Sequence, residues 1–254
     1  MIRRAVVLAL AATLLAACTG SKAQPASGDA PTGTLTVFAA SSLTDVFTGF
    51  GKALEDQQPG LHVRFNFAAS SALATQIVQG APADVFASAN EAQMAVVTNA
   101  GLAADPAVFT SNVLRIAVPA GNPGHVTGLA DFARPDLTLA LCAPQVPCGA
   151  AAQQVFEAAG ITPKPDSLEE DARAALTKVQ LGEVDAALVY ASDVQAAGSK
   201  VEGIDFPEAQ RAVNEYPICT LKATRNPAAA RAFVDMVRSP AGQRALADAG
   251  FRAP

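Results

Sequence analysis

Two pairs of serine residues stand where a predicted strand gives way to a predicted helix. Ser41 and Ser42 follow an apolar strand at 35–39, and Ser70 and Ser71 follow a second strand. The first turn of a helix exposes unpaired backbone N–H groups and the positive end of the helix dipole. Hydroxyl and amide donors at such a turn can hold a small anion. Serine is also a common N-cap, so capping is the commoner explanation of either pair alone, and it is the presence of two such turns, each directly after a strand, that favours an anion site.

Two more helix beginnings in the second half of the chain have the same character. Cys148 and Gly149 precede one helix, and Asp171 and Ala172 open another. In open α/β sheets ligands bind beyond the C-terminal ends of the strands, where helix N-termini point. Four such N-termini facing one cleft would hold an oxyanion without lysine or arginine. From spacing alone we infer a two-lobe binding protein with an anion as the candidate ligand.

The elements that must position these residues alternate between short apolar strands and amphipathic helices, which is typical of a parallel sheet covered on both faces. The turn-rich stretch GNPGH after residue 119 predicts the passage into a second lobe, where the same order begins again. We predict strands at 35–39, 62–67, 84–87, 113–119, 137–142, 185–190 and 216–223. Helices are predicted at 43–57, 72–79, 90–99, 149–159 and 171–181, followed by two closing helices capped by Asn226 and Ser239.

The N-terminus has the pattern of an export signal. Arg3 and Arg4 precede a thirteen-residue apolar stretch at 5–17, which is too short for a permanent membrane span. It ends in Leu-Ala-Ala-Cys18, which resembles the bacterial lipobox. We therefore predict a lipoprotein signal peptide at 1–17 and a flexible, lipid-anchored tether at 18–32. The alternative is an ordinary cleaved signal that happens to precede Cys18.

Charge and cysteine content narrow the partners. Without Arg3 and Arg4, 16 basic residues stand against 23 acidic ones, a net charge of −7. This balance argues against nucleic acid, and any anion site must therefore work through local dipoles. In an oxidising space Cys142 and Cys148 could pair across their short loop, which leaves Cys219 as a buried free thiol. His62 and His125 lie far apart, and the chain has no Cys-x-x-Cys, so no structural zinc site is expected.

Several stretches of the chain resemble the periplasmic molybdate-binding proteins of ABC transporters. The likeness runs in order through LTVFAASSL (35–43), FAASSALATQIVQGAPADVFASAN (67–90), EEDARAAL (169–176), LGEVDAALVYASD (181–193) and PAGQRALADAGF (240–251). It implies an α/β fold of the two-lobed periplasmic binding protein type (type II), with parallel-type sheets and two crossover strands. Lobe 1 would comprise 33–113 and 218–254, and lobe 2 would comprise 114–217.

The resemblance also implies a ligand site. Ser42 and Ser70 would each give a hydroxyl and a backbone N–H, Cys148 and Ala172 a backbone N–H, and Tyr190 its phenol O–H. These residues would hold the oxyanion without direct metal ligands, and no cofactor is implied. Ser41 could share or take the role of Ser42. Cys148 is bulkier than the small residue expected there, and a bond to Cys142 would make its loop rigid. Without the resemblance, Tyr190 reads as a core tyrosine.

The function implied is that of an extracytoplasmic lipoprotein that captures molybdate or tungstate and delivers it to an ABC permease and its ATPase. We expect a monomer with no enzymatic activity. One alternative is a receptor for sulfate, thiosulfate or phosphate. A serine-dependent hydrolase would need a histidine beside Ser42 or Ser70, and no Gly-x-Ser-x-Gly motif is present. A structural or adhesion lipoprotein would bind no oxyanion at all.

Overall fold

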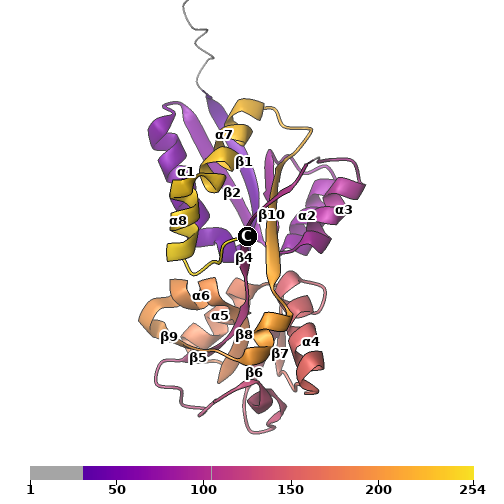
Figure 1. Ribbon diagram of the computed structural model, residues 1–254, viewed down its shortest axis with the longest axis vertical. Coiled ribbons are helices and arrows are strands. Elements are labelled where there is room, and N and C mark those ends of the chain that lie inside the picture. Colours follow the sequence, from indigo (N-terminus) through magenta and orange to yellow (C-terminus); the bar gives the residue numbers. More distant parts are fainter. Residues whose placement is uncertain (1–30, 104) are drawn as a thin grey trace, which may run out of the picture. The chain divides into compact units, whose positions relative to one another are not determined.

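The structure of this chain is a computed structural model that describes residues 31–103 and 105–254. The predicted signal peptide at 1–17, the lipidation site Cys18 and nearly all of the predicted tether at 18–32 lie outside the described residues. From Pro31 onward the chain contains two five-stranded sheets, each flanked by helices (Figure 1).

The first sheet has the strand order β2-β1-β3-β10-β4. Its strands are β1 (Gly33–Ala40), β2 (Leu61–Ala68), β3 (Val85–Ala87), β4 (Ala107–Asn112) and β10 (Asn214–Thr220). β1 pairs in parallel with β2 and β3, whereas β10 runs antiparallel to β3 and β4. The short 3-10 turn η1 (Ser41–Leu43) continues β1 into the first helix. The helices around this sheet are α1 (Thr44–Gln57), α2 (Ser70–Val78), α3 (Glu91–Asn99), α7 (Pro227–Arg238) and α8 (Pro240–Asp248).

The second sheet has the order β7-β6-β8-β5-β9. Its strands are β5 (Leu114–Pro119), β6 (Leu139–Cys142), β7 (Ser167–Glu169), β8 (Ala186–Tyr190) and β9 (Val201–Ile204). β6 pairs in parallel with β7 and β8, and β5 runs antiparallel to β8 and β9. Its helices are α4 (Pro147–Ala159), α5 (Ala172–Leu181) and α6 (Ala191–Ala197), with 3-10 turns at η2 (Leu129–Ala133), η3 (Gly198–Lys200) and η4 (Pro207–Arg211).

Apolar side chains fill both faces of the first sheet and the interior of the second. On one face of the first sheet, α1, α7 and α8 bury a cluster of aromatic rings, while α2 and α3 cover the other face (Figure 1). Phe47 lies at the centre of that cluster and contacts Phe50, Phe109 and Phe233 with ring centroids 5.4 to 5.9 Å apart. The second sheet packs with α4, α5 and α6 around a core of its own. Each sheet and its helices form one lobe.

The chain passes between the sheets at two places. Val113 alone separates β4 of the first sheet from β5 of the second, close to the predicted boundary. On the way back, residues 214–217, predicted in lobe 2, belong to β10 in the first sheet, where Asn214 is already paired with Asn112. The apolar pattern predicts a later start for this strand, at Tyr216, because the first paired residues, Asn214 and Glu215, are polar.

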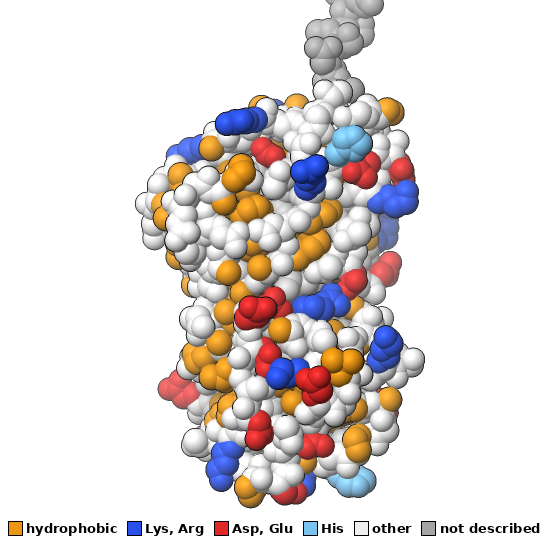
Figure 2. Space-filling model, turned by 180° about the vertical axis from the view of Figure 1, so that it is seen from behind, with side chains coloured by type: hydrophobic (Ala, Val, Ile, Leu, Met, Phe, Trp, Pro, Cys, Tyr) orange, Lys and Arg blue, Asp and Glu red, His pale blue; other side chains and the backbone are white. Residues whose placement is uncertain are grey.

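The described surface carries charges of both signs. Figure 2 shows acidic and basic side chains interspersed over one face rather than gathered in a single-sign patch. None of the described helices combines the length and the apolar character that a membrane crossing needs. In the same part of the chain there is no group of three or more His, Cys, Asp or Glu side chains arranged to hold a metal ion.

Candidate functional site

A small cavity of about 10 Å³ lies where helix beginnings of both lobes meet. It is smaller than the roughly 300–1,000 Å³ pockets that hold drug-sized organic ligands, which favours a ligand of very few atoms. The cavity is lined by all six residues that the sequence singled out: Ser41, Ser42, Ser70, Cys148, Ala172 and Tyr190. His62 and His125 are not among its lining residues, and both are exposed.

Helix N-termini supply the backbone donors of this cavity. Ser70 is the first residue of α2, Ala172 is the first of α5, and Cys148 follows Pro147 in the first turn of α4. The N–H groups of a first turn have no partner inside their own helix, and the helix dipole adds positive potential there. Ser42 lies in η1 directly after β1. The cavity therefore receives donors from two places in each lobe.

The serine hydroxyls do not cap their helices. α1 has Leu43 at its N-cap and α2 has Ala69, and neither helix has a side-chain cap. Ser42 and Asp45, three residues apart, therefore form no capping box, because η1 separates Ser42 from the start of α1. The predicted start of the second helix at Ala72 is also wrong, since α2 begins at Ser70. This shift places Ser70 itself, with its N–H, in the first turn.

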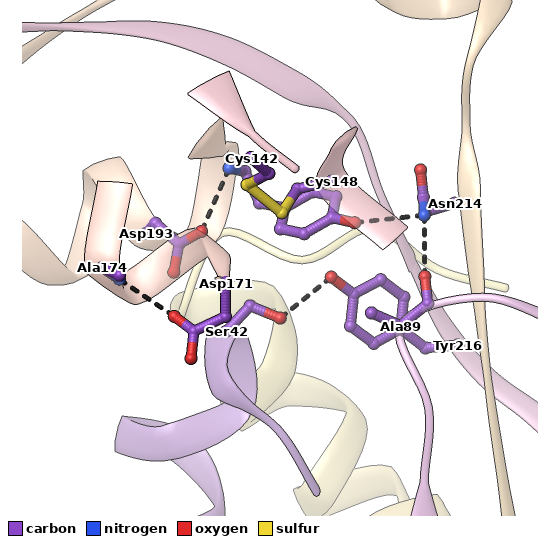
Figure 3. The surroundings of a disulfide bond; sticks show 10 residues. Ser42, Ala89, Cys142, Cys148, Asp171, Ala174, Asp193, Asn214 and Tyr216 are labelled. Atoms are coloured by element: carbon purple, nitrogen blue, oxygen red, sulfur yellow. Dashed lines mark hydrogen bonds between the residues drawn. A yellow bond between two sulfur atoms is a disulfide. The ribbon is translucent and has the colours of Figure 1, made fainter. Parts of the chain in front are cut away.

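Four buried residues with a hydroxyl group line the cavity, and three of these hydroxyls, those of Ser42, Ser70 and Tyr190, have a protein partner. Ser42 Oγ lies 3.0 Å from the Tyr216 hydroxyl. Ser70 Oγ accepts the backbone N–H of Ala89 at 2.9 Å. The Tyr190 hydroxyl accepts from Asn214 Nδ2 at 3.1 Å. The same nitrogen donates to the Ala89 carbonyl at 2.8 Å (Figure 3). Burial raises the pKa of Tyr190 well above its usual range, so its phenol keeps the proton that it can donate.

A disulfide fixes the second-lobe loop that carries Cys148. Cys142, the last residue of β6, is bonded to Cys148 in the first turn of α4 (Figure 3). The Cys148 side chain is thereby turned into this bond. What remains available for a ligand is its backbone. Cys219, as expected, is a buried free cysteine in the first lobe.

The cavity has little positive charge of its own. No lysine or arginine is among the described residues that line it, and the charged lining residue Asp171 accepts the Ala174 N–H at 2.9 Å as N-cap of α5. Arg173 points elsewhere and forms an ion pair with Asp45 at the start of α1 in the other lobe. An anion held here would be met by neutral dipoles.

Behind the cavity lies a buried carboxylate. Asp193, in the first turn of α6, accepts the Tyr190 N–H at 3.0 Å. Burial raises the pKa of Asp193 to about 7, while nearby Arg173 and the Tyr190 N–H act in the opposite direction. Asp193 therefore orients the backbone at Tyr190, at the point where β8 ends.

Sequence reasoning missed the residues that support the three hydroxyls, namely Ala89, Asn214 and Tyr216. A signal for two of them existed. The chain has two tyrosines, and Tyr216 lies in a predicted strand with Asn214 two positions earlier, on the same face. Their meeting with Ser42 and Tyr190 depends on tertiary structure, because the paired residues are 24 to 174 positions apart.

Comparisons with known proteins match nearly the whole described chain. A family model described as bacterial extracellular solute-binding protein matches residues 35–252. The molybdate-binding protein ModA of Mycobacterium tuberculosis (strain H37Rv) is 46% identical over 244 residues, covering 94% of this chain and 93% of that protein. The putative ABC transporter substrate-binding lipoprotein YvgL of Bacillus subtilis is 30% identical over 227 residues, covering 87% and 86%. In fold, the periplasmic molybdate-binding protein of Azotobacter vinelandii is similar with a TM-score of 0.74 at 22% identity, covering 87% of this chain and 99% of that one.

Proposed function

The chain belongs to the bacterial extracellular solute-binding protein family, and from this membership we propose that it captures molybdate or tungstate between its lobes for an ABC importer. The membership confirms the resemblance noted in the sequence, the two-lobed fold, the extracytoplasmic location and a solute-binding rather than enzymatic role. The relatives named as molybdate-binding proteins support the choice of ligand.

The observation that carries this proposal is the donor set of the cavity. Ser42, Ser70 and Tyr190 bring hydroxyls, and the turns at Cys148 and Ala172 bring backbone N–H groups. A fully deprotonated tetrahedral dianion offers acceptors alone, so a cavity of donors satisfies it. In a closed cleft of low dielectric each of these hydrogen bonds is strengthened. Neutral donors suffice for the charge.

The same donor set discriminates among anions. Monohydrogen phosphate brings a proton that meets no acceptor among these five donors, which costs about 1–3 kcal/mol. Sulfate has no proton but is smaller than molybdate, so its oxygens could not reach all donors at about 2.7–3.2 Å. Molybdate and tungstate are nearly equal in size, so we expect the cavity to bind both. A receptor for sulfate or thiosulfate is the alternative.

We further propose that a lipid on Cys18 anchors the protein to the membrane, supported by the lipobox-like sequence and by the relative named as a lipoprotein. The monomer would close its lobes around the anion and present that closed form to the permease, which passes the anion inward with the energy of its ATPase. The hinge is formed by the passages at Val113 and before β10.

Thermal unfolding with different oxyanions tests the ligand. Molybdate and tungstate should raise the melting temperature strongly, because a ligand at about 1,000 times its Kd adds about 4 kcal/mol to the free energy of unfolding. Sulfate and phosphate at the same concentration should do little. An equal shift with sulfate would favour the alternative receptor. A chain that responds to no oxyanion would contradict the proposal.

Removing one hydroxyl tests the site. Ser70→Ala should weaken molybdate binding about tenfold to a hundredfold, because a hydrogen bond to a charged group is lost, while the unliganded fold stays intact. Isothermal titration measures the affinity. Ser71→Ala is the matched control, since Ser71 is the adjacent serine and does not line the cavity. Unchanged affinity in Ser70→Ala would remove Ser70 from the site.

A further inference from the structure

A hydroxyl group can accept as well as donate a hydrogen bond. Hydroxyls around a cavity therefore do not by themselves make a cavity of donors. Each hydroxyl becomes a dedicated donor when its oxygen already receives a hydrogen bond from a neighbour, because its own proton is then the part left for the ligand. The partners of Ser42, Ser70 and Tyr190 decide this direction.

Tyr190 receives its hydrogen bond from Asn214. One terminal atom of the Asn214 side-chain amide lies 2.8 Å from the carbonyl oxygen of Ala89 and 3.1 Å from the Tyr190 hydroxyl. A carbonyl can only accept, so the group beside it must be the amide NH₂ and not the amide oxygen. The same NH₂ therefore donates to the Tyr190 oxygen. The Tyr190 proton must point elsewhere.

The peptide at Ala89 directs Ser70 in the same way. Its N–H lies 2.9 Å from Ser70 Oγ, and a backbone N–H can only donate. Ser70 Oγ is thus an acceptor toward Ala89 and retains its proton for the cavity, which Ser70 lines. Ala89 therefore fixes two hydroxyls: Ser70 directly through its N–H, and Tyr190 through its carbonyl and Asn214.

Ser42 depends on Tyr216, whose hydroxyl lies 3.0 Å away with either oxygen able to donate. Tyr216 is the hydrogen-bond partner of the Ser42 hydroxyl among the described residues. With Tyr216 as the donor in this bond, the Ser42 proton is left for the cavity, as it is for Ser70 and Tyr190.

We propose that Asn214 and Tyr216 are positioning residues that set the direction of the cavity hydroxyls and thereby exclude oxyanions that carry a proton. Both lie on one face of β10, just after the chain returns to the first sheet. Neither lines the cavity, so they act through Tyr190 and Ser42. This inference rests on the proposed oxyanion-binding function and names the source of its selectivity.

The test compares Tyr216→Phe with wild type for molybdate, sulfate and phosphate, the last two measured by displacement of molybdate. The variant removes one oxygen and keeps the ring, which packs against Tyr190 and Phe251. Ser42 would then be free to accept. Affinity for molybdate and sulfate should fall together by about tenfold, and that for phosphate should fall little or rise, so that the preference for molybdate over phosphate drops about tenfold.

Two further variants keep the result interpretable. Thr110→Val is the matched control, because it removes a buried hydroxyl from the residue paired with Tyr216 in β4, where the hydroxyl donates to the Arg252 carbonyl. It should leave the ratios of the affinities for molybdate, sulfate and phosphate unchanged.

Asn214→Asp puts an acceptor beside Tyr190 and turns the Tyr190 proton away from the cavity. The added charge repels every dianion alike, so the preference for molybdate over sulfate should stay the same. The turned Tyr190 proton should reduce the preference for molybdate over phosphate, as in Tyr216→Phe.

The outcomes separate this inference from the proposed function. If wild type binds molybdate and both β10 variants keep the molybdate-to-phosphate ratio, or lose all three anions equally, the positioning role is overturned. If wild type binds sulfate in place of molybdate, the proposed ligand is wrong, and the ratio of sulfate to phosphate then tests the same two residues. A drop in the ratio in both variants, with Thr110→Val unchanged, supports the inference.

Discussion

Asp193 lies three residues after Tyr190 and is fully buried. One of its oxygens accepts the Tyr190 N–H, while the other has no hydrogen-bond partner among the described residues. A carboxylate in such surroundings is disfavoured relative to the neutral acid, which is why burial raises the pKa of Asp193 to about 7. The same carboxyl in the unfolded chain titrates near pH 4.

This difference predicts how stability depends on pH. Between about pH 4 and pH 7 the folded chain holds a proton on Asp193 that the unfolded chain has lost, so the free energy of unfolding falls as the pH rises through this window. The slope at its steepest is on the order of 1 kcal/mol per pH unit. Asp193→Asn should flatten the decline, because the amide still accepts the Tyr190 N–H and cannot ionise. Denaturant unfolding at several pH values measures it.

Asp136→Asn is the control for this prediction. Asp136 is an exposed carboxyl whose pKa is lowered by its hydrogen bond to Arg134, so its contribution has the opposite sign and lies at lower pH. The variant should keep the decline between pH 4 and pH 7. A wild-type chain whose stability stays constant or rises over this window would contradict the raised pKa of Asp193.

The sequence indicates the residues that line the cavity better than the residues that hold their hydroxyl groups in place. Ser42 and Ser70 stand out because each follows a strand directly, and the turns at Cys148 and Ala172 are recognisable as helix starts. Tyr190 was selected through family resemblance, because a buried tyrosine alone has an ordinary core explanation. Asn214 and Tyr216 share one face of a strand in the sequence pattern, but their partners are not visible there, since their contacts arise when β10 returns to the first sheet.

Among the elements, the start of α4 has the least room for change. A Cβ at Gly149 would lie 1.9 Å from the carbonyl oxygen of Ala143 and 2.7 Å from that of Cys142. Both are backbone atoms of the loop that the disulfide closes, so neither can rotate away. The small residue allows the first turn of α4, and with it the Cys148 N–H, to lie against the end of β6.

We therefore predict that Gly149→Ala displaces this turn. The free energy of unfolding should fall by about 1–3 kcal/mol, which is typical of overpacking, and molybdate affinity should fall with it because the Cys148 donor moves. Gly49→Ala is the matched control: Gly49 is also in a helix, nothing lies within 4 Å of its added Cβ, and alanine is the better helix former. Equal stability and affinity in both variants would contradict the prediction, because the loop between Cys142 and Cys148 would then accommodate the added methyl group.

Element prediction succeeded where a segment is long and periodic and failed where it is short or polar. The main apolar strands and the long helices are present within a few residues of their predicted bounds. β4 was missed because its second half, Thr110 to Asn112, is polar, and β7 because it has three residues with Leu168 exposed. The antiparallel pairing of β5 and β10 was not foreseen either, because direction depends on how each crossover enters its sheet.

For the molecule as a whole, several of the described contacts between the lobes lie beside the proposed anion site. Asn214 of the first sheet holds Tyr190 of the second, and Asn112 at the end of β4 donates to Ser192 of α6 at 2.8 Å. The cavity itself combines helix beginnings from both lobes. A hinged opening would separate these groups, so ligand and protein contacts would both favour the closed arrangement.

The ion pair between Asp45 of α1 and Arg173 of α5 is one such contact, and it gives the last prediction. The ion pair joins the two lobes, so it stabilises the closed form and not an open one. Asp45→Asn should therefore speed molybdate dissociation up to about fivefold at low ionic strength. Pairs this exposed contribute about 0–1 kcal/mol and are screened by salt, so the effect should vanish near 1 M salt. Stopped-flow measurement of the dissociation rate checks this prediction.

Asp56→Asn is the control: it removes the ion pair with Lys52 within α1 and should leave the dissociation rate unchanged. If Asp45→Asn and Asp56→Asn dissociate alike at low salt, the ion pair does not hold the lobes closed.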